Sequence, residues 1–536
     1  MSRALPPESQ LATHEVLNQP DGPGDRDLWP GDQALRDAVA ANGGDAGRLA
    51  RHARALGTAD LAEAAREANR CPPELRLFDR SGRRLDEVGF HPAYHRFLHL
   101  GLGAGYAALP WSGAKGGHVT HAAMVYLHSQ VEPGTCCPMT MTYAAGALLG
   151  ADPHLARDWL PKITSSAYDP AIAPASEKPG VTLGMALTEK QGGSDLRATS
   201  TRAGRDGDHW RLTGHKWFCS APMSDAFLTL AQTGKGLTCF LVPRWLPGER
   251  NAIRLMRLKD KLGNRSNASA EIEYERALAF QVGGDGRGIP TILSMVHHTR
   301  LDTAMAPAGL MRAALAEAHR WATHRTAFQK RLIDQPLMRA VIADLALDWI
   351  GATALGLRVA RAFDGTAEAD RAFARIAVAL AKFLANKRCV VVVAEAMEVL
   401  GGMGYVEETP LPLLYREAPL NGIWEGSGNV ICLDILRTLA REPLSAETLA
   451  AELDAARGQS RAYDTALADA RAGWPGAVPE AEARAFAERT SMLVTASVLL
   501  RQMPDIGAAY AAARLAPQGF TPGTAPVAPG PILARL

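Results

Sequence analysis

The sequence predicts an α+β protein of several domains, in which a small β domain lies between two helical regions. Three observations predict this class. Ala- and Leu-rich segments with helical spacing fill about the first 170 residues, short and partly alternating runs follow, and three long amphipathic stretches come next. Because strand-like and helix-like patterns occupy separate parts of the chain, separate α and β domains are favoured.

The composition is that of a globular protein. The chain has 536 residues, of which 47% are hydrophobic and 21% are charged, enough for roughly two to four domains. Its 58 basic and 56 acidic residues give a net charge of +2, which argues against a partner recognised by overall charge. The seven cysteines lack metal-ligand spacing, so no metal is expected. We see neither a signal peptide nor an apolar run of about 18–20 residues, so we expect no membrane contact and a cytoplasmic protein.

Residues 1–180 are expected to form an N-terminal α domain. Residues 1–32 are rich in Pro, Gly and Asp and are expected to run as an extended arm over the surface. The pattern from Leu35 to about Ala68 is helical, residues 71–95 indicate a loop followed by a helix start, and helical patterns continue to Trp159.

Residues 181–288 are expected to form a small antiparallel β domain, either a sandwich or a barrel. Turn residues such as Gly192-Gly193 and Gly263-Asn264 separate its strand-like runs. The expected strands are Val181–Thr188, Arg197–Arg205, His209–Phe218, Phe227–Gln232, Leu237–Val242, Ile253–Leu258 and Ala268–Tyr274.

Residues 289–441 are expected to form a four-helix bundle. Three helices are expected at Thr291–Arg325, Leu337–Phe363 and Ala367–Leu400, and a fourth after Glu425. Residues 442–536 are expected to be a C-terminal helical extension that ends in a Pro- and Gly-rich tail, Ala516–Pro531, without regular structure.

The stretch Ile423–Asn429 is the strongest candidate site. Glu425 lies between Trp424 and a Gly-Ser-Gly-Asn run, and the helical pattern resumes directly afterwards. Ser427 and Asn429 are suited to cap that helix, and burial beside Trp424 would raise the pKa of Glu425 towards that of a general base. The alternative is an ordinary loop before a capped helix.

The domain order and four motifs resemble those of the acyl-CoA dehydrogenase family, so the acyl-CoA dehydrogenase fold is expected. The motifs are Leu187–Asp195, Lys216–Ser220, Arg325–Gln335, and Glu398–Tyr405 combined with the Glu425 loop. In the family the first motif bonds the flavin ring, the second covers its face near N5, and the third grips the pyrophosphate of FAD. The glycine turn of the fourth holds the dinucleotide of a neighbouring subunit.

The resemblance implies FAD as cofactor and a set of residues that bind it. Trp217 would pack on the flavin, with a core indole as the alternative. Cys219 aligns with the usual threonine near N5, where a thiol is a poor donor. The expected cofactor-binding residues are Leu187, Thr188, Gly193, Ser194, Trp217, Phe218, Cys219, Ser220, Arg325, Phe328, Gln335, Gly401, Gly402, Trp424, Ser427 and Asn429.

The resemblance also implies an oxidoreductase acting on CH–CH bonds. Glu425 would be the general base that removes the α-proton while a hydride goes to flavin N5, or else only a structural loop residue. Three residues would face the substrate: Arg300, His297 in place of the family's acidic residue, and Lys190 at the entrance in place of a Pro-rich turn. These departures predict weak activity on acyl-CoA. His297 and His298 point about 100° apart on a helix, which argues against a shared metal.

Within the family, the chain resembles the AidB-type branch, through Leu17–Pro20, Met141-Thr142, Thr188–Asp195, Lys259–Ser269 and Ile423–Asn429. This resemblance implies a homotetramer, a role in the adaptive response to DNA alkylation, and binding of double-stranded DNA through the C-terminal region. An electron-transferring flavoprotein is a possible electron acceptor by family resemblance. The alternative to an enzyme is a DNA-associated protective flavoprotein that shields the duplex or inactivates alkylating agents without acyl-CoA turnover.

The charge of the C-terminal extension does not favour DNA binding there. Residues 443–536 carry eight arginines and no lysine against nine acidic residues, a net charge of −1. The preceding helices are better candidates, with solvated helix faces as the alternative. Their basic residues are Arg358, Arg361, Arg371, Arg375, Lys382, Lys387 and Arg388.

Overall fold

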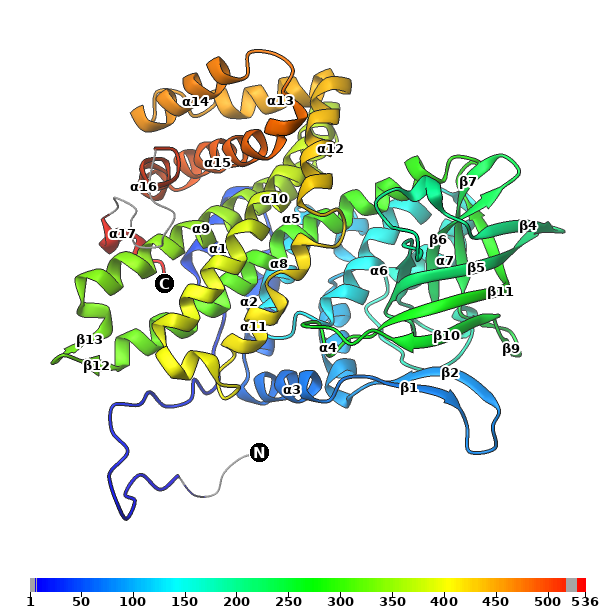
Figure 1. Ribbon diagram of the computed structural model, residues 1–536, viewed down its shortest axis with the longest axis horizontal. Coiled ribbons are helices and arrows are strands. Elements are labelled where there is room, and N and C mark those ends of the chain that lie inside the picture. Colours follow the sequence, from blue (N-terminus) through cyan, green and yellow to red (C-terminus); the bar gives the residue numbers. More distant parts are fainter. Residues whose placement is uncertain (1–4, 6, 517–527) are drawn as a thin grey trace.

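A computed structural model of the chain describes residues 5, 7–516 and 528–536. The N-terminal region holds α1 (Gln33–Asn42), α2 (Ala46–Leu56), α3 (Ala59–Arg70), α4 (Pro92–Ala104), α5 (Gly117–Ser129), α6 (Cys136–Leu149) and α7 (Pro153–Ile163). The first three helices begin at polar N-cap residues, Asp32, Asp45 and Thr58, whose side chains accept a backbone N–H three residues later. Before them, much of the N-terminal arm projects away from the body of the chain and not over its surface (Figure 1), and its Asn18 contacts Arg325 and Thr326.

Within residues 71–95 the expected loop was wrong, whereas the expected helix start is confirmed by α4 at Pro92. The segment forms a hairpin of β1 (Glu74–Phe78) and β2 (Arg84–Gly89), and α4 follows it. Strand β1 alternates between exposed Glu74 and Arg76 and half-buried Leu75 and Leu77, but β2 carries charged residues on both faces and shows no such alternation. The hairpin is held by the β domain, because Asp86 accepts the Leu255 N–H at 2.8 Å and Arg84 donates to the Leu255 carbonyl.

The β domain is barrel-like. Its strands are β3 (Leu183–Ala186), β4 (Arg202–Asp206), β5 (His209–Ser220), β6 (Ala226–Thr233), β7 (Gly236–Pro243), β8 (Trp245–Leu246), β9 (Glu249–Arg250), β10 (Ile253–Leu258) and β11 (Ser269–Val282). Strands β11, β5, β4, β6 and β7 pair in a closed ring, with β10 and β3 attached at its edges. The expectation of a purely antiparallel domain was wrong, because β3 and β4 both run parallel to β6.

Four long helices form the predicted bundle: α8 (Gly288–His324), α9 (Pro336–Asp364), α10 (Glu368–Val399) and α12 (Gly428–Arg441). A small hairpin of β12 (Thr326–Ala327) and β13 (Lys330–Arg331) joins α8 to α9, and α11 (Leu411–Glu417) precedes the Glu425 loop. Helix α9 is long and apolar enough to cross a membrane, but 83% of its most apolar window is buried, as in the core helix of a globular domain.

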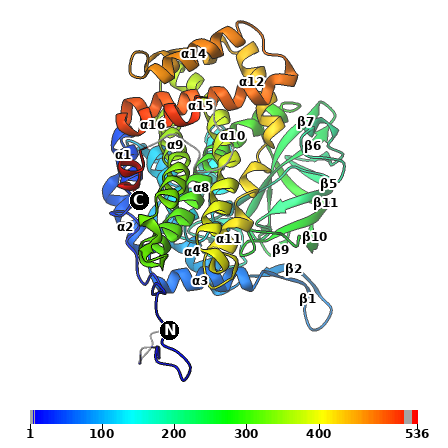
Figure 2. The same cartoon turned by 60° about the vertical axis from the view of Figure 1, so that its left-hand side comes forward.

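The C-terminal extension covers the bundle (Figures 1 and 2). It consists of α13 (Pro443–Asp454), α14 (Arg461–Gly473), α15 (Ala483–Gln502), α16 (Pro504–Arg514) and α17 (Pro529–Leu533), and α13, α15 and α17 pack on α9 or α10. Of the tail expected to lack regular structure, residues 517–527 lie outside the described part, whereas Pro529–Pro531 belong to α17, contrary to expectation.

The basic residues that we expected to face DNA are mostly engaged within the chain. Arg358 pairs with Glu452, Arg375 with Asp434 and Glu442, and Arg388 with Asp348. Arg361 and Arg371 donate to backbone carbonyls, Lys382 is buried under the Glu425 loop, and Lys387 lies beside Gly428. Arg361, Arg371 and Lys387 remain exposed, so a basic surface for phosphates along these helices stays a prediction that now rests on these three residues.

Candidate active site

The Glu425 loop is a strained segment held in place by two cations. Glu425 has φ +58° and Gly426 has φ +103°, a left-handed conformation that costs a non-glycine residue about 1–2 kcal/mol. The Lys382 Nζ donates to the carbonyls of Asn421 at 2.8 Å and Gly426 at 2.9 Å, and Arg300 Nε donates to the Glu425 carbonyl at 3.2 Å. These three bonds fix the backbone on both sides of the carboxylate.

The carboxylate of Glu425 is arranged as a base. Burial raises its pKa, while the Thr299 hydroxyl, which donates to Oε2 at 2.6 Å, and the charges of Lys382 and Arg300 oppose that rise. Burial also lowers the pKa of Lys382 to about 7, against the attraction of Glu425. A buried carboxylate with a raised pKa is suited to accept a proton from carbon near neutral pH.

A cavity of about 60 Å³ opens beside Glu425. It lies between α5, α6, α8, the Glu425 loop and the end of β5, where the helical core meets the β domain. Its lining residues are Val125, Pro133, Cys136, Cys137, Thr140, Met141, Met185, Ser220, Thr299, Asp302, Thr303, Ala306, Glu417, Asn421, Trp424 and Glu425. Of the residues expected at the flavin, Ser220 and Trp424 line this cavity.

Cys219 and Ser220 face opposite sides of β5. Cys219 is fully buried in the β-domain core, where burial raises its pKa to about 12. Successive strand residues point to opposite faces, so Ser220 faces the cavity instead. The structure therefore places Ser220, and not Cys219, in the wall of the cavity.

The two β-domain motifs lie side by side next to this cavity. The Trp217 N–H donates to the Thr188 carbonyl at 2.7 Å, and Leu187 follows β3 directly. A Cβ added at Gly193 would come within 2.2 Å of Thr188 Oγ1, so only glycine fits there. Ser194 and Phe218 are exposed. These residues form a surface on which a planar ring could lie.

Trp217 is surrounded by cations that the sequence analysis did not associate with it. Lys259 Nζ lies 3.4 Å from its ring centroid, Arg257 lies 5.4 Å away, and Lys190 lies 5.6 Å away. Lys190, expected at the substrate entrance, is thus placed over Trp217, where a cation–π contact holds it. The spacing of Lys259 in the sequence gave no signal of this contact.

Beneath the motifs, a buried ion pair joins their two strands. Glu189 Oε1 lies 2.7 Å from Lys216 Nζ, and both side chains are almost completely buried. Burial alone would raise the pKa of Glu189, but Lys216 and the hydroxyls of Thr201 and Ser200 lower it well below its usual range. The sequence analysis missed this pair, although Glu189 and Lys216 both lie within the motifs it singled out.

The remaining expected cofactor residues lie at the far end of the bundle. Arg325 ends α8, 26 residues after Thr299, which places it about 39 Å away along the helix. Its Nη1 donates to the Asn18 carbonyl, Gln335 donates to the Ala327 carbonyl, and Phe328 is 93% exposed. Gly401 follows Lys382 by 19 residues, or about 28 Å. A ligand at Glu425 therefore does not reach these residues in the same chain.

Arg300 and His297 do not face the cavity as free groups. Arg300 Nη1 pairs with Asp434 at 2.6 Å, besides bonding the Glu425 carbonyl. His297 stacks on Phe363 with ring centroids 4.6 Å apart, and burial lowers its pKa well below the usual value. Among the described residues, no group of three or more His, Cys, Asp or Glu side chains is arranged to hold a metal.

The start of α12 differs in detail from expectation. Ser427 occupies the N-cap position, but its side chain makes no capping bond. Asn429 Oδ1 accepts a hydrogen bond from Arg484 of the C-terminal extension, and Trp424 Nε1 donates to Asn421 Oδ1. The extension thus contacts the loop that carries Glu425.

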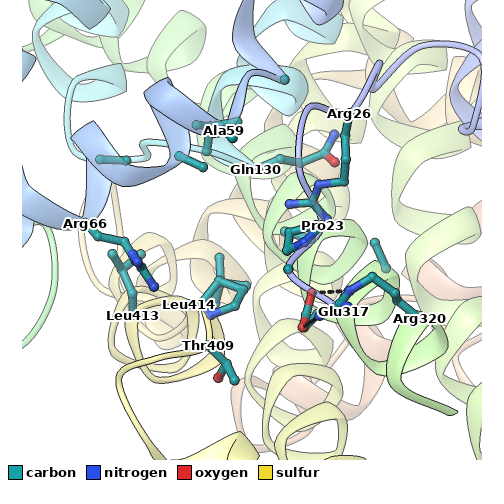
Figure 3. A pocket seen from close by; sticks show the side chains of 18 of the residues that line it. Pro23, Arg26, Ala59, Arg66, Gln130, Glu317, Arg320, Thr409, Leu413 and Leu414 are labelled. Carbon is teal, nitrogen blue, oxygen red and sulfur yellow. Dashed lines mark hydrogen bonds and ion pairs between the residues drawn. The ribbon is translucent and has the colours of Figure 1, made fainter. Parts of the chain in front are cut away.

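A second, larger cavity lies elsewhere. It has a volume of about 1190 Å³ and is enclosed by the N-terminal arm, α3, α8 and α11 (Figure 3). Figure 3 shows Arg26 and Gln130 at one end and the Arg320–Glu317 ion pair at another. Since none of the expected site residues lines it, the small cavity at Glu425 remains the candidate active site.

The domain order, the barrel-like β domain and the Glu425 loop define the class: the chain belongs to the acyl-CoA dehydrogenase family. Residues 18–170 match "Adaptive response protein AidB N-terminal domain", residues 184–277 match "Acyl-CoA dehydrogenase, middle domain", and residues 286–440 match "Acyl-CoA dehydrogenase, C-terminal domain". Members of this family bind FAD.

Within the family, the chain is 48% identical to "Putative acyl-CoA dehydrogenase AidB" of Escherichia coli (strain K12), over 85% of this chain and 86% of that protein. The structure titled "Bd2924 apo-form" superposes with a TM-score of 0.82 at 28% identity, covering 90% of this chain and 99% of that one. Caenorhabditis elegans ACDH-11 in complex with C11-CoA gives a TM-score of 0.84 at 24% identity, covering 97% and 96%. The predicted fold class and the AidB-type resemblance are confirmed.

Proposed function

We propose that this protein is an FAD-dependent oxidoreductase that removes hydrogen from a CH–CH bond, with Glu425 as the general base. The observation that carries the proposal is the Glu425 carboxylate, which lines the cavity, has a raised pKa and stands on a backbone fixed by Lys382. FAD would supply the hydride acceptor at N5. The residues fit it, because Thr188, Gly193 and Trp217 form a continuous surface beside the cavity.

Each residue around the cavity would have a separate role. Glu425 takes the α-proton, Thr299 orients its carboxylate, and Lys382 and Arg300 hold the loop so that the carboxylate faces the cavity. The Glu425 backbone N–H would bond a substrate carbonyl and stabilise developing enolate charge. Ser220 would replace the family's threonine near the ring.

Acyl-CoA turnover is expected to be weak. His297 is stacked on Phe363 and Arg300 is bound to Asp434, so neither offers free contacts to coenzyme A. The C. elegans relative is solved with C11-CoA, which supports a thioester as one class of ligand. We place the protein in the adaptive response to DNA alkylation, on the match of residues 18–170 to the AidB N-terminal domain.

The alternative is a DNA-associated flavoprotein that shields the duplex or inactivates alkylating agents without acyl-CoA turnover. The AidB relationship favours it, whereas the internal pairing of the basic residues on α9 and α10 opposes it. We further propose a cytoplasmic homotetramer with an electron-transferring flavoprotein as electron acceptor. The remote position of Arg325 and Gly401 supports an oligomer in which these residues serve a neighbouring subunit's cofactor.

The test is an anaerobic titration of the yellow holoprotein with short acyl-CoA esters and with alkylating agents, following the oxidised flavin band. Slow bleaching by a branched short ester such as isovaleryl-CoA is expected. The Glu425→Gln variant should keep its flavin and lose the bleaching, because an amide retains the shape but accepts no proton. Undiminished bleaching in this variant, or a protein that binds no FAD, would refute the proposal.

A further inference from the structure

A buried histidine–aspartate pair forms part of the wall of the Glu425 cavity. Asp302 lies on α8, three residues after Thr299, so both side chains project from one face about a turn apart. His121 on α5 is fully buried, and its Nε2 lies 2.7 Å from Asp302 Oδ1. Asp302 itself lines the cavity, next to Thr140.

The hydrogen bonds of His121 indicate how many protons the His121–Asp302 pair carries. His121 Nδ1 lies 2.7 Å from the Tyr106 carbonyl, which only accepts, so Nδ1 carries a hydrogen. Nε2 faces a carboxylate oxygen at 2.7 Å, where two bare acceptors would repel, so a proton lies between them as well. The pair therefore holds one proton more than a neutral histidine beside a carboxylate, and its net charge is zero.

Asp302 retains capacity to accept a further hydrogen bond. Its Oδ2 accepts the Thr140 hydroxyl at 2.5 Å and the Tyr106 hydroxyl at 3.4 Å, and Oδ1 faces His121. A carboxylate offers about four acceptor positions, so about one remains. Asp302 lines the cavity, so a ligand bound there lies next to this carboxylate.

The rest of the wall is mixed, with apolar side chains such as Val125, Met141 and Met185 beside polar ones. Three carboxyl groups line the cavity, and the described lining includes no lysine, arginine or histidine. The other polar lining residues are Thr140, Ser220, Thr299, Thr303 and Asn421. Thr140, Thr299 and Thr303 already donate to Asp302, to Glu425 and to the Arg300 carbonyl. A hydrocarbon end would therefore chiefly leave the remaining acceptor position of Asp302 unpaired. The volume of about 60 Å³ admits a small group, of roughly four to six water-sized atoms at about 10–15 Å³ each.

We propose that Asp302, held by His121, is a specificity-determining residue that binds a hydrogen-bond donor at the end of the substrate. The site thereby selects a short substrate ending in a hydroxyl group over a hydrocarbon chain of the same length. This inference rests on the proposed function, because it takes Glu425 as the position of the reacting carbons. A hydrogen bond to a charged group corresponds to a preference of about 10- to 100-fold.

The test compares two thioesters of equal length, pentanoyl-CoA and 4-hydroxybutyryl-CoA, which differ only in a terminal methyl or hydroxyl. Dissociation constants are measured on the anaerobic holoprotein from the perturbation of the flavin band, and bleaching rates are recorded separately. The wild type should bind the hydroxyl ester about 10- to 100-fold more tightly. Equal binding, or binding of neither ester, overturns the assignment.

Asp302→Asn is the informative variant. Its amide would donate to a neutral His121 Nε2 and still accept from Thr140, so the pair stays bonded while the charged acceptor is lost. The hydroxyl preference should fall to a few-fold, and an unchanged preference contradicts the proposal. Asp225→Asn is the matched control, because Asp225 is equally buried and pairs with Lys178 outside the cavity. If the hydroxyl ester binds more tightly but neither ester bleaches the flavin, the proposed dehydrogenation is refuted and the assignment of Asp302 is retained.

Discussion

At Glu425, burial favours the protonated carboxyl, and three neighbours favour the charged form. The closest of these is the Thr299 hydroxyl, which donates to the carboxylate at 2.6 Å. Thr299→Val removes that donor without changing the shape of the side chain, so the pKa of Glu425 should rise further. The pH dependence of flavin bleaching should then move to higher pH, with a several-fold slower rate at pH 7.

Thr353→Val provides the control for this experiment. Thr353 is a buried threonine on α9 whose hydroxyl bonds only the Trp349 carbonyl of its own helix. Its pH profile should match the wild type. A profile that moves equally in both variants would assign the effect to helix stability and not to Glu425.

Glu417, also in the cavity wall, should make stability depend on pH. Burial raises its pKa to about 7, against the hydrogen bond from the Asn264 N–H. A pKa above the unfolded value contributes stability that is complete below about pH 4.5 and is lost as the pH rises through 7. The free energy of unfolding of Glu417→Gln should therefore be close to that of the wild type at pH 5. At pH 8 it should be higher than that of the wild type, by up to about 3 kcal/mol. An equal difference in unfolding free energy between the variant and the wild type at both pH values would contradict this.

At the scale of elements, the C-terminal extension is tied to the bundle by a buried charge cluster. Arg514 at the end of α16 bonds Asp344 at 2.6 Å and Asp348 at 2.9 Å, both on α9. Arg514→Leu leaves two buried carboxylates without that partner, which should cost about 3–5 kcal/mol in unfolding free energy by denaturant titration. Arg471→Leu, which breaks only an exposed pair with Asp454, should cost less than about 1 kcal/mol.

Elements with strong periodicity were the ones that the sequence predicted well. The helices expected at Leu337–Phe363 and Ala367–Leu400 end within a residue or so of α9 and α10, because long apolar faces define both. The β1–β2 hairpin was missed because β2 does not alternate and the residues that anchor the hairpin, Leu255 and Arg244, lie 158 to 171 residues away in the sequence. Parallel pairing of β3 with β6 leaves no local signal either.

The candidate site was predictable only in part. The Glu425 loop was found because its residue types are unusual together. Whether Cys219 or Ser220 faces the cavity depends on a one-residue alternation in β5 that alignment alone does not fix. His121 and Asp302 stand 181 residues apart, and neither belongs to a motif, so their contact appears only in the folded chain.

At the scale of the whole molecule, binding of DNA should be weak and dependent on salt. The C-terminal extension carries a net charge of −1, and Arg358, Arg375 and Arg388 are paired internally. Fluorescence anisotropy of a labelled duplex at 50 and 200 mM salt should show few phosphate contacts, each contributing a slope of about −0.9 in log affinity against log salt. A slope steeper than about −6 would show that assembly creates a basic groove absent from one chain.

The distance between the two groups of cofactor residues has a consequence for handling the protein. Glu425 bonds Thr299 in the first third of α8, whereas Arg325 ends that helix about 39 Å further along. If both groups contact one FAD, they come from different chains, and each cofactor links two copies. Dilution should then release flavin and dissociate the assembly together, by mass action. Free flavin fluorescence after serial dilution should rise at the protein concentration at which light scattering falls. Added FAD should move both transitions to lower protein concentration.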